Sequence, residues 1–226
     1  MLFRSMDKTK SSKTYVVPDL HGCEHLLVKF LKNHYDYKSK LIFLGDYVDR
    51  GPNSRGTIQL VRSLVDTTGA IALQGNHEQM MYESVLDEVS YTWVINGGDV
   101  TYKEYSVDHD LDGLKYDAKW LKTLPKYYED EHRVYVHASV DPHEDLQHTD
   151  DRVLLWGRYG KMEDGGGYRG KHVVHGHTPA RSVVLMPNRT CLDTGAVFYG
   201  TLAVGVFDDD TPGGPVDIIH VEEDKQ

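Results

Sequence analysis

The stretch that decides the fold is LIFLGDYVDRG, residues 41–51, in which an apolar run leads directly into a polar turn. Two further stretches share this design: YVVPDLHG at residues 15–22 and AIALQGNHE at residues 70–78. In each, a short β-like apolar run ends in Asp, Asn or His side chains. We therefore expect three successive strands, Tyr15–Val17, Leu41–Leu44 and Ala70–Leu73, each with potential ligands at its carboxyl end.

Helices are predicted between these strands. Glu24–His34 and Ser54–Asp66 carry apolar side chains at helical spacing, for example Leu26, Leu27 and Phe30 in the first of them. Strands that alternate with helices over short connections are typical of a layered α/β fold. Because such sheets bind ligands at the carboxyl ends of their strands, the polar turns lie where a site is expected.

The second half of the chain has a different pattern. Its strand-like runs are Arg133–Val136, His172–Val174, Ser182–Leu185, Thr190–Leu192, Thr201–Phe207 and Val216–Val221. Helices are expected earlier, over Glu78–Val89 and Asp117–Leu124. A parallel half followed by a more antiparallel half predicts an α/β fold in which two mixed β-sheets pack together and are flanked by helices.

One domain is expected for residues 14–226, because no stretch has the composition of a linker. Residues 1–13 are polar and basic, and we interpret them as a flexible leader. The run Glu163–Gly170, with three consecutive glycines, is expected to be a mobile loop.

Composition excludes several classes of partner. A net charge of −10 argues against nucleic acid, which needs a basic surface. No run of 18 apolar residues is present, so no membrane span is expected.

The first residues lack the apolar core of a secretory signal. Two cysteines, Cys23 and Cys191, are too few for a disulfide framework and fit a cytoplasmic location.

The polar turns supply oxygen and imidazole ligands, and two more histidines follow strands in the second half. The candidate ligands are Asp19, His21, Asp46, Asn76, His137 and His177. Such ligands suit Mn²⁺, Fe, Zn²⁺ or Mg²⁺ rather than a thiolate metal site. The pattern is that of a two-metal hydrolase, whose usual substrate is a phosphate ester.

Each motif alone has a simpler structural interpretation. Asp19-Leu20-His21 could be a helix-entry turn, and Asp49 with Arg50 could be a surface ion pair. A histidine that ends an apolar strand, as His137 does, is often structural. The combination at successive strand ends favours function for all of these.

Five motifs in a fixed order form a more specific pattern. They are Asp-x-His-Gly at residues 19–22, Gly-Asp-x-Val-Asp-Arg-Gly at 45–51, Gly-Asn-His-Glu at 75–78, Val-His-Ala at 136–138 and Gly-His-Thr-Pro at 176–179. Together they resemble the calcineurin-like metallophosphoesterases of the serine/threonine protein phosphatase family, and above all its phage-lambda-like members. The likeness extends to Asn96-Gly97-Gly98 and Asp193–Phe198. Pro18 is a departure, because most members have Gly before the first ligand. The lambda-like pattern has no ligand at position 175, so the resemblance implies a structural His175.

The resemblance implies a four-layer αββα sandwich and a pair of divalent metal ions. Asp19 and His21 would bind the first ion, and Asp46 would bridge both. The second ion would be completed by Asn76, His137 and His177. Mn²⁺ is the expected metal, with Fe, Zn²⁺ and Mg²⁺ as alternatives.

The resemblance also implies four catalytic roles. His77 would protonate the leaving-group oxygen, and Asp49 would orient it. Arg50 and Arg158 would bind the phosphate. The implied activity is a phosphomonoesterase that acts on protein phosphoserine and phosphothreonine, with phosphotyrosine as a further substrate, through attack of a metal-bridging hydroxide.

Two other functions remain open at this point. The same site would serve a symmetrical diadenosine tetraphosphate hydrolase, which acts on a small phosphate ester. A scaffold that binds metal without catalysis is the second alternative. The resemblance to phage and bacterial members implies the cytoplasm of a bacterium or of a phage-infected host.

Overall fold

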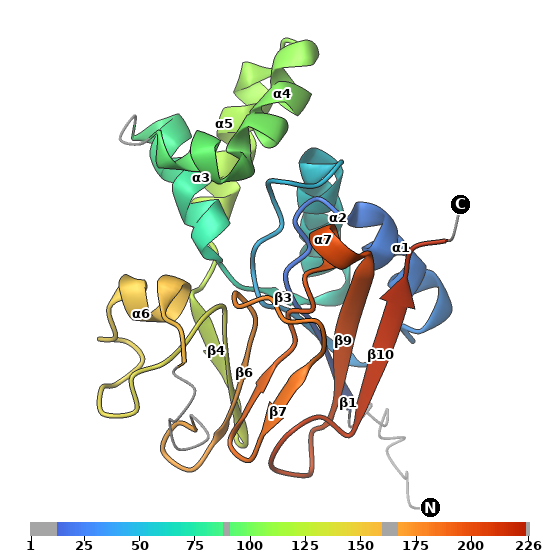
Figure 1. Ribbon diagram of the computed structural model, residues 1–226, viewed down its shortest axis with the longest axis vertical. Coiled ribbons are helices and arrows are strands. Elements are labelled where there is room, and N and C mark those ends of the chain that lie inside the picture. Colours follow the sequence, from blue (N-terminus) through green and yellow to red (C-terminus); the bar gives the residue numbers. More distant parts are fainter. Residues whose placement is uncertain (1–12, 88–90, 160–166, 225–226) are drawn as a thin grey trace, which may run out of the picture.

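Two five-stranded β-sheets packed face to face form the centre of the computed structural model, which describes residues 13–87, 91–159 and 167–224 (Figure 1). Helices lie on the outer side of each sheet and above one end of the strands. Over the described residues, no helix combines the length and apolar character that a membrane span needs.

The first sheet has the strand order β10-β9-β1-β2-β3. Its strands are β1 (Lys13–Val17), β2 (Lys40–Phe43), β3 (Ile71–Ala72), β9 (Thr201–Asp208) and β10 (Asp217–Glu222). β1, β2 and β3 are parallel neighbours, as the sequence predicts, whereas β9 and β10 pair antiparallel on the other side of β1. The carboxyl ends of β1, β2 and β3 therefore meet at one edge.

The second sheet has the strand order β4-β5-β6-β8-β7. Its strands are β4 (Tyr127–Glu129), β5 (Arg133–Val136), β6 (His172–His175), β7 (Val184–Met186) and β8 (Arg189–Cys191). β5, β6 and β8 are parallel, and only the edge strands β4 and β7 are antiparallel. The expectation of a more antiparallel second half was wrong for the centre of this sheet. The long connection between β5 and β6 is a crossover, which places the two strands parallel.

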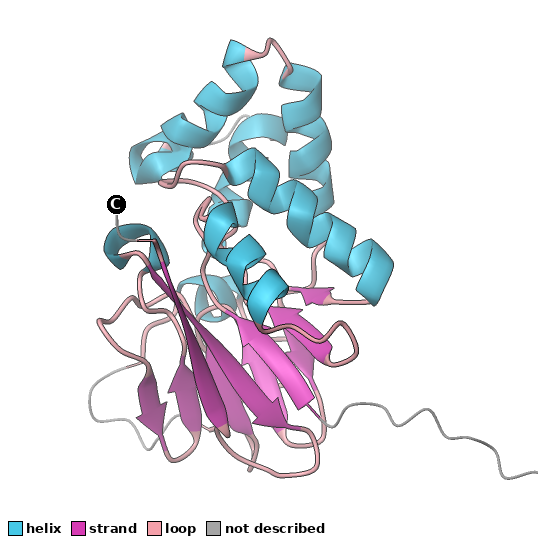
Figure 2. Ribbon diagram, turned by 90° about the vertical axis from the view of Figure 1, so that its right-hand side faces the viewer, coloured by secondary structure: helices cyan, strands magenta, loops and turns pink. Residues whose placement is uncertain are grey.

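Apart from the short α7, the helices divide into three groups. They are α1 (Glu24–Asn33), α2 (Ser54–Thr68), α3 (Asn76–Leu86), the π-helical turn η1 (Val94–Gly98), α4 (Asp99–Val107), α5 (Leu111–Lys122), α6 (Asp151–Trp156) and α7 (Ala196–Tyr199). α1 and α2 cover the first sheet, and α6 lies on the side of the second. We call α3, η1, α4 and α5 the helical cap; they stand together beyond the strand ends (Figures 1 and 2).

Alternating residues of β1 divide the core into layers. Val16 packs between the sheets with Ile42, Tyr135 and Phe207. Its neighbour Val17 faces the opposite way, into the core beneath α1 and α2. A strand that is buried on both faces has apolar residues at successive positions. For this reason β1 shows no alternation of apolar and polar residues in the sequence. A third cluster, beneath α6, completes the predicted four layers.

The sequence predicts most strands and the first two helices within two residues of their observed ends. The helical cap differs most. α5 begins at Leu111 rather than at Asp117, and α4 and η1 are not predicted. α4 buries only Thr101 and Tyr105, so its apolar periodicity is too weak to indicate a helix.

Several expectations fall partly outside the described residues. Residues 1–12 of the expected leader do so, and Lys13 is already part of β1. The expected end of a helix at Val89 also lies outside, and α3 begins two residues earlier than predicted. Of the expected mobile loop, residues 163–166 lie outside, whereas Tyr168 is buried and pairs with Lys171.

Candidate active site

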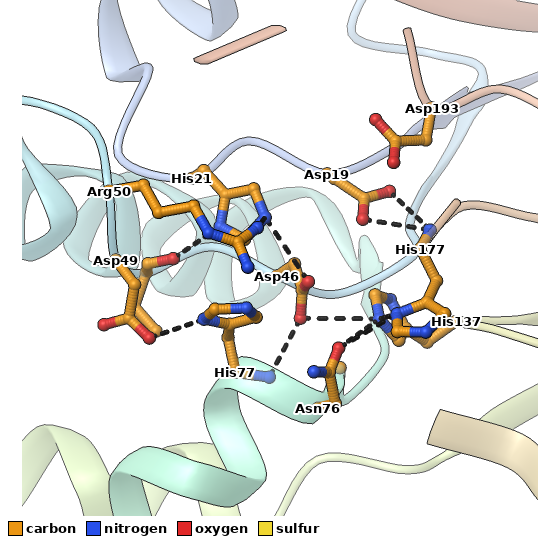
Figure 3. Close-up of polar contacts among 12 residues, drawn as sticks. Asp19, His21, Asp46, Asp49, Arg50, Asn76, His77, His137, His177 and Asp193 are labelled. Atoms are coloured by element: carbon orange, nitrogen blue, oxygen red, sulfur yellow. Dashed lines mark hydrogen bonds and ion pairs between the residues drawn. The ribbon is translucent and has the colours of Figure 1, made fainter. Parts of the chain in front are cut away.

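All ten predicted site residues gather where the carboxyl ends of strands from both sheets meet the helical cap. Nine of them are seen together in Figure 3: Asp19, His21, Asp46, Asp49, Arg50, Asn76, His77, His137 and His177. The tenth, Arg158, lines the same pocket as Arg50 and His77. The structure therefore brings all ten residues together, while their individual roles stay predictions.

The backbone of this cluster adopts a conformation that L-residues seldom take. Positive φ angles occur at His21 (42°), Asp46 (54°), Asp49 (74°), Arg50 (69°) and His177 (65°). Each non-glycine residue in this region costs of order 1 kcal/mol, and such residues concentrate at functional sites. Half of the predicted site residues thus have a backbone conformation that is typical of functional sites.

Gly176 allows the turns after β1 and β6 to touch. A Cβ atom there would lie 1.9 Å from Asp19 Oδ2, so a larger residue would displace that carboxylate. The backbone N–H of His177 donates to Asp19 Oδ1 at 3.0 Å and to Oδ2 at 3.2 Å. This contact joins a ligand candidate of the first sheet to one of the second.

Asp46 lies at the centre of the cluster. Its Oδ2 is 3.5 Å from His21 Nε2, and its Oδ1 is 3.5 Å from His137 Nε2. The donor atoms of Asp46, His137 and His177 all lie within 4.8 Å of one another, and so do those of Asp46, His21 and His77. Asp46 is common to both sets. The set with His21 contains His77, which is predicted as the acid, and neither set contains Asp19, which is predicted as a ligand.

Carbonyl groups fix the protons on two of the imidazoles. His21 Nδ1 donates to Val48 O at 2.8 Å, and His137 Nδ1 donates to Leu44 O at 3.0 Å. Burial lowers the pKa of both side chains well below the usual value, so each ring is neutral. The Nε2 atom of each therefore presents a lone pair to Asp46, which is the arrangement of a metal ligand.

The second set brings further lone pairs together. Asn76 Oδ1 lies 2.9 Å from His137 Nε2 and 3.1 Å from His177 Nδ1. Since His137 Nε2 carries no proton, two electron-pair donors face each other there. Burial and neighbouring carboxylates also raise the pKa of Asp19 and Asp46 well above the usual value. A bound cation would offset both effects, so the donor set fits divalent metal.

Asp49 and His77 form a buried pair beside this cluster. His77 Nδ1 lies 2.6 Å from Asp49 Oδ2, and both side chains are almost fully buried. Burial raises the pKa of Asp49 to about 7 and lowers that of His77 well below its usual value. The contact fixes the ring so that Nε2 is the nitrogen left for a substrate in the pocket.

A pocket of about 280 Å³ opens over the cluster. Its lining residues are Asp46, Arg50, Asn76, His77, Asn96, Trp156, Arg158, His177, Pro179 and Phe198. The guanidinium of Arg50 donates to His21 Nε2 at 2.7 Å and lies 5.8 Å from the centre of the Phe198 ring. The pocket thus combines two cationic side chains, Arg50 and Arg158, with two partly exposed aromatic side chains, Trp156 and Phe198.

Sequence reasoning assigned no role to several residues of the site. Glu78, although part of a quoted motif, accepts the backbone N–H groups of Asp46 (2.7 Å), Tyr47 (2.8 Å) and Gly75 (2.8 Å). Asp193 is buried beside Asp19, and its pKa is raised to about 6 by burial. The place of Glu78 in the Gly-Asn-His-Glu motif could have identified it from the sequence.

His175 lies outside both donor sets, as expected. Its Nε2 accepts from Arg189 Nη1 at 3.2 Å, and the ring contacts Tyr159. Cys23 and Cys191 are unpaired and buried in the core.

Comparison with known proteins gives consistent results. The model of the calcineurin-like phosphoesterase family matches residues 12–200. Serine/threonine-protein phosphatase 1 of Salmonella typhimurium is 31% identical over 214 residues, which are 90% of this chain and 95% of that protein. The asymmetrical bis(5'-nucleosyl)-tetraphosphatase PrpE of a Geobacillus species is 28% identical and covers 84% of this chain and 88% of its own length.

A solved structure of a protein serine/threonine phosphatase from Saccharomyces cerevisiae aligns with a TM-score of 0.70. The alignment covers 97% of this chain and 82% of that one at 16% identity, so it bears on the fold alone.

Proposed function

Because the chain belongs to the calcineurin-like phosphoesterase family, we propose that it is a metal-dependent phosphomonoesterase acting on phosphoserine and phosphothreonine in proteins. One observation carries this proposal: potential metal ligands, a buried Asp–His pair and two arginines surround a single pocket. The relative from Salmonella, which is named a serine/threonine-protein phosphatase and matches over 95% of its length, supports a protein substrate. Phosphotyrosine is a further proposed substrate.

The proposed metal ligands are Asp19, His21, Asp46, Asn76, His137 and His177. Asp46 would bridge two ions, since its two oxygens face imidazoles on opposite sides. Oxygen and imidazole ligands make Mn²⁺ the first choice, with Fe, Zn²⁺ and Mg²⁺ as alternatives. When bound, two such cations activate water and neutralise the charge of the phosphoryl group.

The remaining side chains would bind the phosphate and move a proton. Arg50 and Arg158 would donate to the phosphoryl oxygens, because a guanidinium matches them with paired N–H groups. His77 would donate its Nε2 proton to the leaving oxygen. Asp49 would accept the Nδ1–H of His77 and so stabilise the charged ring that this step requires.

A second candidate is hydrolysis of a dinucleoside tetraphosphate. The aromatic walls Trp156 and Phe198 favour it, because a purine base can stack on such side chains. The likeness to the Geobacillus bis(5'-nucleosyl)-tetraphosphatase points the same way. Both candidates use the same site, so only the substrate separates them.

A substrate panel tests the proposal. A phosphoserine peptide, a phosphotyrosine peptide and diadenosine tetraphosphate are each incubated with the protein and Mn²⁺, Mg²⁺ or a chelator. We expect the phosphoserine peptide to be hydrolysed with the highest kcat/KM, and the chelator to abolish turnover. A higher kcat/KM for diadenosine tetraphosphate would favour the second candidate. No metal-dependent turnover of any substrate would indicate a scaffold and refute both.

A further inference from the structure

Thr101 of α4 and Trp93, which directly precedes η1, reach the far side of Asp49. Trp93 Nε1 donates to Asp49 Oδ1 at 2.9 Å, and Thr101 Oγ1 donates to the same oxygen at 2.7 Å. All three side chains are almost completely buried. Asp49 Oδ2 faces His77 Nδ1, so one carboxylate has three donors around it and water does not reach it.

The hydroxyl proton of Thr101 can be assigned. Asp49 N–H lies 2.9 Å from Ser54 Oγ and 3.0 Å from Thr101 Oγ1, so both hydroxyl oxygens accept there. Thr101 has one hydroxyl proton, and the carboxylate at 2.7 Å is its strongest acceptor. Thr101 Oγ1 also lies 2.9 Å from Ser54 Oγ. The side-chain donors that contact the carboxylate of Asp49 thus support its ionised form.

This arrangement matters because burial acts against ionisation. Desolvation is the largest influence and raises the pKa of Asp49 to about 7, although the hydrogen bonds from Thr101 and Trp93 and the charge of Arg50 act in the opposite direction. A protonated Asp49 could not accept the Nδ1–H of His77 with the same strength. The ring would then lose the contact that fixes its orientation.

We propose that Trp93 and Thr101 are positioning residues for the reaction: they hold Asp49 as a carboxylate aimed at His77 Nδ1, and the helical cap thereby sets the general acid. The inference deepens the proposed function and rests on it. Trp93 directly precedes η1, and Thr101 lies in α4. Neither segment contributes a proposed metal ligand.

The test compares substrates that differ in how much they need an acid. Thr101→Val removes the hydroxyl at nearly constant volume, Trp93→Phe removes the N–H, and Thr101→Ser restores the hydroxyl as the matched control. Each is assayed with a phosphoserine peptide and with 2,4-dinitrophenyl phosphate, whose leaving group needs no proton. We expect kcat to fall about 10- to 100-fold for the peptide in the first two variants, and less than about threefold for the aryl ester. KM, bound metal and the Thr101→Ser variant should stay near wild type.

A double-mutant cycle gives a second readout. If Thr101 acts through Asp49, Thr101→Val should have little further effect on kcat in the Asp49→Asn background. Equal losses for both substrates, an inactive Thr101→Ser protein, or additive effects in the cycle would overturn the inference. Failure of both Thr101→Val and Trp93→Phe to fold would do the same, because the donors would then serve the core. An inactive wild-type protein would instead refute the proposed function.

Discussion

Single residues of the site could be predicted where a motif and a strand end coincide. Asp46, Asp49 and Asn76 lie in polar turns that follow apolar runs, and the structure brings them together. Trp93 and Thr101 could not be predicted, because they reach Asp49 only through the packing of the cap. Their sequence separation from it is 44 and 52 residues, and nothing local marks either one.

We expect His172, which lies outside the site, to make the free energy of unfolding depend on pH under acidic conditions. His172, at the start of β6, is buried, and its Nε2 lies 2.8 Å from Thr190 Oγ1. Burial lowers the pKa of His172 to about 4, whereas an unfolded histidine titrates near 6.5. Between these values the unfolded chain takes up a proton that the native protein does not. The free energy of unfolding should therefore fall by roughly 1 kcal/mol for each pH unit lost, after allowance for partial exposure.

Urea unfolding at pH 7 and pH 5 measures this effect. Wild type should lose about 1 to 2 kcal/mol more than His172→Gln between the two values, since glutamine does not titrate. Metal ligands titrate equally in both proteins and cancel in the comparison. An identical loss in wild type and variant would show that His172 does not carry this dependence.

At the scale of elements, the first turn of α3 is tied to the turn after β2. The carboxylate of Glu78 accepts three backbone N–H groups, from Asp46, Tyr47 and Gly75. This one side chain therefore sets the distance between the proposed bridging ligand and the helix that carries Asn76 and His77. Sequence patterns predicted both elements, whereas the connection between them is a tertiary contact.

Replacing Glu78 by Gln should loosen this connection. The amide NH₂ would face backbone N–H groups, so at least one of them would lose its acceptor. We expect the free energy of unfolding to fall by about 1 to 3 kcal/mol and Mn²⁺ to bind more weakly, measured by urea unfolding and calorimetry. Glu83→Gln, on the same helix, is the control and should cost less than about 0.5 kcal/mol. Equal stability of the two variants would count against this role for Glu78.

Among the elements, strands were easier to predict than the cap. β1, β2 and β5 are short apolar runs that end in polar turns, and such runs have few alternative structures. In the cap, α4 buries only Thr101 and Tyr105, so its apolar periodicity is too weak to indicate a helix. The parallel pairing of β5, β6 and β8 also escaped prediction, because strand order depends on crossovers rather than on local sequence.

At the scale of the whole molecule, the site joins the two sheets. The proposed ligands follow β1 and β2 of the first sheet, stand at the start of α3, and follow β5 and β6 of the second. The cap and the adjoining Trp93 add the groups that hold Asp49. Bound metal would thus stabilise the packing of both sheets, and the chemistry depends on all the layers being in place.

The most direct test of the central claim is a titration of chelator-treated protein with Mn²⁺, in which bound metal per chain and hydrolysis of a phosphoserine peptide are measured together. Wild type should gain activity as metal binds, with a plateau at two ions per chain. His77→Asn should bind the same two ions and turn over the peptide roughly 100-fold more slowly. Full activity without metal, or a His77→Asn protein as fast as wild type on the peptide, would contradict a two-metal phosphoesterase with His77 as its acid.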